Sequence, residues 1–158
     1  MRSTRLSQSA RPFEPHPIFA EPMAYLFDTN AISEVLRPKP NPEFAEWVAR
    51  LPRDQQFTSA VVAGELYAGA YKAGSNKWLE RIEQEVLPRV TVLPFDLQTA
   101  KHYGRIRSEL AAAGTPIGDA DTQIAATALR FDLTVVTANS LHFERVANLE
   151  VWGFTPGA

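Results

Sequence analysis

Short apolar runs alternate along this chain with longer segments whose apolar residues recur at helical spacing. The runs lie at residues 25–28, 57–58, 90–93 and 133–137, and a last apolar run covers residues 149–154. Such alternation is typical of a parallel sheet covered by helices, because parallel strands need a crossover connection that is usually helical. The sequence therefore predicts an α/β fold with a mainly parallel central sheet. Its 158 residues, 45% of them hydrophobic, are enough to bury the core of one compact domain.

Polar residues mark where several helices begin. Asn41 followed by Pro42 predicts the start of a helix that continues through Leu51, because Asn is a favoured cap and Pro a favoured first residue. The same preferences predict further helix starts after Ser59, Ser75 and Asp96. We expect the helix after Ser75 to reach Leu87.

Composition separates the chain into an extension, a domain and a tail. Residues 1–22 contain four prolines and no helical or alternating apolar period, so we expect a flexible N-terminal extension upstream of a natural translation start at Met23. The folded domain is expected to cover residues 23–154, followed by a short tail at residues 155–158.

Cysteine is absent, and the net charge is slightly negative. Without cysteine the chain offers neither a zinc–thiolate site nor a thiol nucleophile, so its chemistry must use oxygen and nitrogen groups. The formal charge of −2 and the isoelectric point of about 5.9 give no basic footprint of the kind that nucleic-acid binding usually leaves. No apolar run approaches the roughly 20 residues that cross a bilayer, and the N-terminus lacks the apolar core of a secretory signal. We expect a soluble, cytoplasmic protein without a membrane segment.

Asp28 is the sharpest local signal of a functional site. It directly follows an apolar strand, and open α/β sheets bind ligands at the carboxyl ends of their strands. A buried strand rarely ends in a carboxylate for packing reasons, because desolvating a charge is costly unless a cation or hydrogen bonds compensate it. The alternative is that Asp28 only caps the following helix, and its position favours neither interpretation.

Two further carboxylates could join Asp28. Asp121 stands just before the small-residue segment 124–128, whose helix can pack closely on the sheet and turn its first residues toward the strand ends. Asp119, two residues earlier, is more readily explained as a helix cap. Glu65 lies beside an apolar helix face and could equally be a solvated residue. Three clustered carboxylates would suit Mg²⁺ or Mn²⁺, which prefer oxygen ligands.

Four blocks of the sequence resemble the successive blocks of a VapC-type PIN domain. They are YLFDTNAISEVLRPKPNPEFAEWV, TSAVVAGELYAGAYKAG, LPFDLQTAKHYGRIRSEL, and GDADTQIAATAL followed by LTVVTANSLHFERVANLEVW. The similarity spans roughly residues 24–154, with the blocks in the family's order and at fitting spacing. It implies a three-layer α/β/α fold and Mg²⁺-dependent cleavage of RNA.

The resemblance implies roles for individual residues. Asp28, Glu65 and Asp121 match the first three acidic positions of the family, and Asn139 stands at the fourth. Asp28 and Asp121 would hold Mg²⁺, or Mn²⁺, directly or through water, while Glu65 would orient the attacking water. Asn139 would position a water or a phosphate oxygen as a neutral ligand. Because this fourth position is not acidic, we expect one ion to bind more firmly than a second.

Neighbouring residues would support this centre. Asn30 and Thr137 would steady the carboxylates, and Arg37 and Lys39 would contact the RNA backbone. His142 stands where relatives often carry another aspartate. Its imidazole could act as an acid or a base, but we expect an ordinary surface or capping residue.

The resemblance also implies protein partners. VapC-type proteins pair as homodimers and are silenced by a cognate VapB-type antitoxin that wraps the toxin and covers its site. The aromatic side chains of Phe44, Trp47 and Trp78 could serve such contacts, although helical periodicity favours a place in the core.

Two other functions fit parts of the pattern. An aspartate after a first strand also begins haloacid-dehalogenase-like phosphatases, in which Asp28 would be a covalent nucleophile. Members of that family carry a second aspartate two residues later, where this chain has Asn30. The second alternative is a catalytically degenerate PIN module that binds RNA or a protein partner, because Asn139 replaces an acid.

Overall fold

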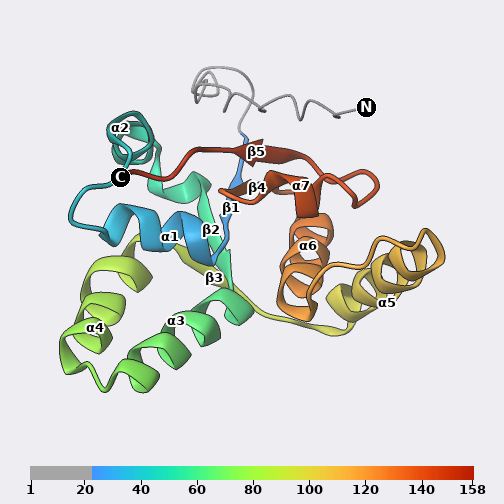
Figure 1. Cartoon of the computed structure of the whole chain (residues 1–158), viewed down its shortest axis with the longest axis horizontal. Coiled ribbons are helices and arrows are strands. Elements are labelled where there is room, and N and C mark those ends of the chain that lie inside the picture. Colours follow the sequence, from blue (N-terminus) through green and yellow to red (C-terminus); the bar gives the residue numbers. More distant parts are fainter. Residues whose placement is uncertain (1–22) are drawn as a thin grey trace, which may run out of the picture.

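A five-stranded, entirely parallel sheet forms the centre of the molecule (Figure 1). The computed structural model describes residues 23–158. The strands follow the order β3-β2-β1-β4-β5, with β1 at Tyr25–Phe27, β2 at Gln56–Ser59, β3 at Thr91–Leu93, β4 at Thr134–Thr137 and β5 at Val151–Gly153. The predicted parallel sheet is confirmed, and the last apolar run provides its fifth strand.

Helices cover both faces of this sheet. They are α1 (Thr29–Leu36), α2 (Pro42–Arg50), α3 (Ala60–Ala73), α4 (Asn76–Arg81), α5 (Leu97–Ala112), α6 (Asp119–Phe131) and α7 (Ser140–Phe143). Figure 1 shows α1, α2 and α4 on one side of the sheet and α5 and α6 on the other. Right-handed connections produce this division, because the chain crosses the sheet in one direction from β1 to β3 and in the opposite direction from β3 through β4 to β5, and α5 and α6 lie between β3 and β4. The expected three-layer α/β/α arrangement is present.

Most helix starts are where the sequence predicts them. The Asn41 side chain accepts hydrogen bonds from the N–H groups of Glu43 and Phe44, and Ser59, Ser75 and Asp96 each accept one from the residue three positions later. Each cap satisfies donors that the first turn of a helix leaves free.

Two helix predictions are wrong. Gly118, not Asp119, caps α6, and the Asp119 carboxylate accepts a hydrogen bond from the Tyr103 hydroxyl at 3.1 Å instead. The segment expected to form one helix up to Leu87 is α-helical only as far as Arg81, where α4 ends. Residues Ile82–Val86 then form a π-helical turn. A 3₁₀ turn, Leu87–Arg89, follows, where Pro88 lacks the N–H that would extend the helix. A further 3₁₀ turn, Arg53–Gln55, precedes β2.

The core lies between the sheet and the helices and contains two of the three aromatic residues considered as partner contacts. Phe44 and Trp47 are 0% and 3% exposed. The Trp47 ring meets the Tyr25 ring edge-on at 5.1 Å, and the Phe44 ring stacks on Phe154 at 4.0 Å. The core interpretation is therefore confirmed for both. Trp78 is 40% exposed and stays a candidate for an outside contact.

A buried glutamate fixes the predicted short tail against the rest of the domain. The Glu34 carboxylate accepts hydrogen bonds from the N–H groups of Asn41 and Gly157 at 2.8 and 2.6 Å, and from the Arg37 guanidinium at 3.1 Å. Burial opposes the charge on Glu34, but these donors outweigh it and hold the pKa of the carboxyl below its usual value. A side chain on Gly157 would overlap the carbonyl oxygen of Lys39, so the contact requires glycine.

The expected extension at residues 1–22 lies outside the described residues. Within residues 23–158, no helix is both long enough and apolar enough to cross a membrane.

Candidate metal centre

Asp28 lies where the order of the sheet reverses. β1 and β4 are neighbours, but the chain continues from β1 toward β2 and from β4 toward β5, so the segments leaving the two strands diverge. Such a point is where open parallel sheets bind ligands. The Asp28 N–H donates to the carbonyl oxygen of Val136 at 3.1 Å, which ties the end of β1 to β4. The Asp28 side chain is therefore held at the carboxyl edge of the two central strands.

The Asp28 carboxylate caps α1 and is also a buried group whose negative charge is unfavourable in this environment. Its Oδ1 accepts the N–H of Ala31 at 2.8 Å, and the residue is only 3% exposed. Burial raises the pKa of Asp28 to about 6, against hydrogen bonds from Thr137 and Ala31 that lower it, and repulsion from Asp121 and Glu65 raises it further. Negative charge therefore gathers here without full compensation, which is the environment that a bound cation would relieve.

Glu65 reaches this edge from α3, which contacts both α1 and α6. Its Oε1 accepts a hydrogen bond from the Thr29 hydroxyl at 2.7 Å. The Glu65 side chain is exposed, as is Asn30 in the first turn of α1. Glu65 is thus anchored through one oxygen while the side chain remains open to water.

A chain of polar contacts links Asp121 to Asp28. Asp121 lies in the first turn of α6, with Oδ2 3.2 Å from Nδ1 of His142. The same nitrogen is 2.8 Å from Nδ2 of Asn139, whose backbone N–H donates to Oγ1 of Thr137 at 2.9 Å. Thr137 is fully buried, and its hydroxyl donates in turn to the Asp28 carboxylate. The structure therefore brings all four predicted catalytic positions and Thr137 to one place.

The sequence led us to expect an ordinary surface or capping residue at His142, but its ring contacts Asp121 and Asn139 and so belongs to this group. The available signal was its position three residues after Asn139. The single turn of α7 places residues at that spacing on the same side, but the sequence alone did not predict this short helix.

Arg37 and Lys39 lie at the other end of α1 from the acidic group. The eight residues of α1 span about 12 Å at the usual rise of a helix. Arg37 pairs with Glu34 and donates to the carbonyl oxygen of Ala158, and Lys39 is exposed in the loop that follows. An RNA contact at these two residues stays a prediction.

The donors at the acidic edge suit one kind of ion. Among residues 23–158, no three His, Cys, Asp or Glu side chains stand close enough together to enclose a metal directly. This arrangement does not fit structural zinc, which takes four protein ligands. It fits Mg²⁺, which binds through one or two carboxylates and keeps several waters.

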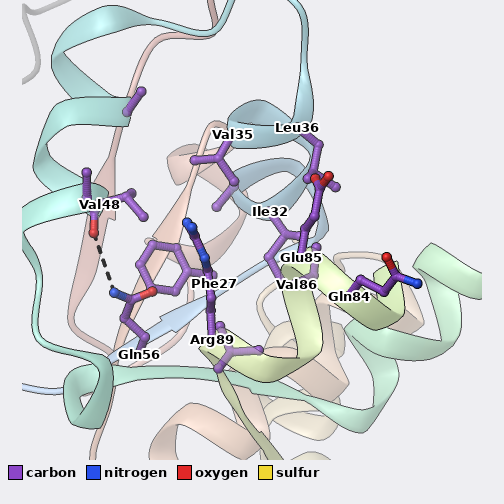
Figure 2. A pocket seen from close by; sticks show the side chains of 14 residues that line it. Phe27, Ile32, Val35, Leu36, Val48, Gln56, Gln84, Glu85, Val86 and Arg89 are labelled. Atoms are coloured by element: carbon purple, nitrogen blue, oxygen red, sulfur yellow. Dashed lines mark hydrogen bonds between the residues drawn. The ribbon is translucent and has the colours of Figure 1, made fainter. Parts of the chain in front are cut away.

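A separate pocket of about 340 Å³ opens between α1, α2 and the segment after α4 (Figure 2). Apolar side chains, among them Phe27, Ile32 and Val35, form most of its wall. Gln56 adds a polar group, but its Nε2 donates to the carbonyl oxygen of Val48 at 3.4 Å. None of the acidic residues of the candidate centre lines this pocket, so it is not the place where their chemistry would occur.

Comparison with known proteins identifies clear relatives. The sequence pattern of the PIN domain matches residues 25–149. Toxin FitB of Neisseria gonorrhoeae is 40% identical over 124 residues, which are 75% of this chain and 89% of FitB. The tRNA(fMet)-specific endonuclease VapC of Salmonella typhimurium is 33% identical over 129 residues, which are 82% of this chain and 96% of that protein. The crystal structure of FitAcB from Neisseria gonorrhoeae matches with a TM-score of 0.74 at 38% identity, over 81% of this chain and 96% of that one.

Proposed function

Because this chain belongs to the PIN-domain family, we propose that it is a metal-dependent ribonuclease toxin of the VapC and FitB type. One observation carries the proposal. Asp28, Glu65 and Asp121 come from three separate segments, yet they lie close enough for the charges of the other two to raise the pKa of Asp28. Its two relatives named as a toxin and as a tRNA-specific endonuclease support the same function.

Asp28 and Asp121 are the residues that would hold Mg²⁺, or Mn²⁺ in its place, directly or through water. When bound, such an ion neutralises charge on the phosphodiester and makes water a better nucleophile at neutral pH. The chain fixes Asp28 through the Ala31 N–H and the Thr137 hydroxyl, and it fixes Asp121 through His142. Both carboxylates are thus oriented before any ligand arrives, which reduces the reorganisation needed for binding.

Glu65 is suited to orient the water that attacks the phosphodiester. The Thr29 hydroxyl engages Oε1, and the exposed side chain leaves the second oxygen able to accept a proton from water. Asn30, exposed beside Thr29, would steady the same group. Thr137 would hold the Asp28 carboxylate and the start of α7 in fixed positions relative to each other.

The two alternative functions fare differently. PIN-family membership argues against the phosphatase, which would need Asp28 as a nucleophile and a second aspartate where Asn30 stands. A degenerate module that binds RNA without cutting it differs from the nuclease in the outcome of a cleavage assay.

We also propose that an antitoxin of VapB type silences this chain and that the chain pairs as a homodimer in the cytoplasm, where its RNA substrate would be met. The relative named toxin FitB supports the first. The exposed apolar side chains of Val92, Phe95 and Leu97 around the start of α5 support the second, because water-exposed apolar groups favour association. Light scattering measures the mass of the purified chain in solution. Twice the mass of one chain would support pairing, and the mass of one chain would contradict it.

Cleavage of total RNA tests the proposed activity. With Mg²⁺ the wild-type chain should cut RNA, whereas EDTA or Asp121→Asn should reduce cleavage to background. Asp119→Asn is the matched control, because it makes the same change two residues away at a carboxylate engaged by Tyr103. It should keep most of the activity. Full cleavage by Asp121→Asn, or cleavage that EDTA does not affect, would contradict the proposal, and metal binding without cleavage would favour the degenerate module.

A further inference from the structure

His142 faces two partners with a single ring nitrogen. Its Nδ1 lies 3.2 Å from Oδ2 of Asp121 and 2.8 Å from Nδ2 of Asn139. A carboxylate accepts hydrogen bonds and cannot donate them, so the contact with Asp121 requires a proton on Nδ1. Both the neutral Nδ1–H tautomer and the imidazolium meet this requirement.

The proton on Nδ1 decides how the Asn139 amide faces the ring. An N–H group cannot accept from the amide NH₂, but a half-turn of the amide exchanges its oxygen and nitrogen without moving any other atom. In that orientation Nδ1–H donates to Oδ1 of Asn139 as well as to Asp121. The opposite assignment would turn a nitrogen lone pair toward the Asp121 carboxylate, which is repulsive.

The side chains of His142, Asp121 and Asn139 lie where the candidate centre meets solvent. Phe143, the residue after His142, is fully buried and anchors α7, while the His142 and Asp121 side chains are 40% and 29% exposed. Across residues 23–158, no other basic side chain pairs with Asp28, Glu65 or Asp121. Within the described part of the chain, His142 is therefore the one basic side chain that these carboxylates contact.

Resting on the nuclease function proposed above, we propose that His142 is a positioning residue for Asp121. Its Nδ1–H would fix the rotation of the Asp121 carboxylate through Oδ2 and leave Oδ1 available to hold the ion. The same N–H engages Oδ1 of Asn139, so Asn139 is not an ion ligand. Its free NH₂ group instead faces the site as a donor for a phosphate oxygen of the RNA. Of the two roles expected from the sequence, positioning a water or a phosphate oxygen, the fourth position of this chain thus has the second.

Three substitutions at His142 test the donor atom itself. The amide nitrogen of Asn reaches about the place of Nδ1, that of Gln reaches about the place of Nε2, and Ala offers no donor. We expect His142→Ala to weaken Mn²⁺ binding about tenfold, the lower end of what loss of a ligand's hydrogen-bond partner causes. His142→Asn should restore most of the affinity, and His142→Gln should not. Mn²⁺ binding is measured by electron paramagnetic resonance of the free ion, with the melting temperature in EDTA and cleavage of total RNA recorded for each variant.

Asn139→Ala tests the other half of the proposal. It should keep Mn²⁺ affinity within about threefold of the wild type, well short of the effect of losing a ligand's partner, but lower RNA cleavage. Wild-type affinity in His142→Ala, or equal rescue by Gln and Asn, overturns the positioning role, and loss of Mn²⁺ binding in Asn139→Ala overturns the assignment of Asn139. Failure of the wild-type chain itself to bind Mn²⁺ and to cut RNA would refute both this inference and the nuclease function, whereas the other outcomes leave the nuclease function intact.

Discussion

Asp28 serves the fold and the candidate site with the same carboxylate. One oxygen accepts the Ala31 N–H at the start of α1, while the group as a whole faces the charges of Asp121 and Glu65. The sequence left a cap and a functional residue as alternatives, but the two roles are compatible. The cap bond lowers the pKa that burial raises, so it helps to keep the carboxylate available as a ligand.

The raised pKa of Asp28 predicts how its contribution to the free energy of unfolding changes with pH. The folded pKa of about 6 lies above the unfolded value of 3.8, so ionised Asp28 destabilises the metal-free fold. A difference of about two pH units corresponds to about 3 kcal/mol. This penalty is fully present above pH 6 and disappears as the pH falls toward 4, because the carboxyl is then protonated in both states.

Asp28→Asn removes the ionisation and keeps an oxygen for the Ala31 N–H. In EDTA at pH 7 it should therefore unfold at a higher urea concentration than the wild type, and the gap should close as the pH approaches 4. Asp119→Asn, at an exposed carboxylate, should show no such convergence. An Asp28→Asn variant whose stability advantage does not change with pH would refute the account of this charge.

The carboxyl end of β4 organises the site at the scale of an element. Thr137 donates to Asp28 and accepts from the Asn139 N–H, so its hydroxyl joins the ends of two strands to the start of α7. Sequence patterns predicted the strand and a supporting role for Thr137. They did not predict α7, because a helix of four residues shows no apolar period. His142 was missed for that reason.

Thr137→Val should disturb both stability and cleavage. Valine keeps the shape of the side chain but leaves the Asn139 N–H without its acceptor, at a cost of about 1–3 kcal/mol, and removes a donor that orients Asp28. Urea unfolding and RNA cleavage measure the two effects. Thr134→Val makes the same change at the opposite end of β4, at a residue that is similarly buried, and should retain cleavage. Equal cleavage by the two variants would remove Thr137 from the site.

At the scale of the whole molecule, the order of strands is what assembles the centre. The chain places β4 beside β1 only after it has passed through β2 and β3, so Asp28 meets residues more than ninety positions away. Alternating apolar runs were sufficient to predict the sheet, and the family resemblance was sufficient to order the three carboxylates.

Contacts between distant segments could not be read from the sequence. The bond between Glu34 and Gly157 spans 123 positions, and no local pattern indicates it. The same contact region holds Arg37, for which an RNA contact was expected from its position in the chain alone. Arg37 lies away from the acidic group because the length of α1 stands between them.

We infer that Asp28 and Asp121 together hold one divalent ion at the reversal point of the sheet. A crystal of the chain soaked in Mn²⁺ tests it most directly, because Mn²⁺ scatters anomalously and its position can be mapped without prior assumptions. We expect an anomalous peak from an ion bound to both carboxylates, directly or through water. The peak should disappear in Asp121→Asn crystals and persist in Asp119→Asn crystals. No peak at this edge, or a peak that survives Asp121→Asn unchanged, would contradict it.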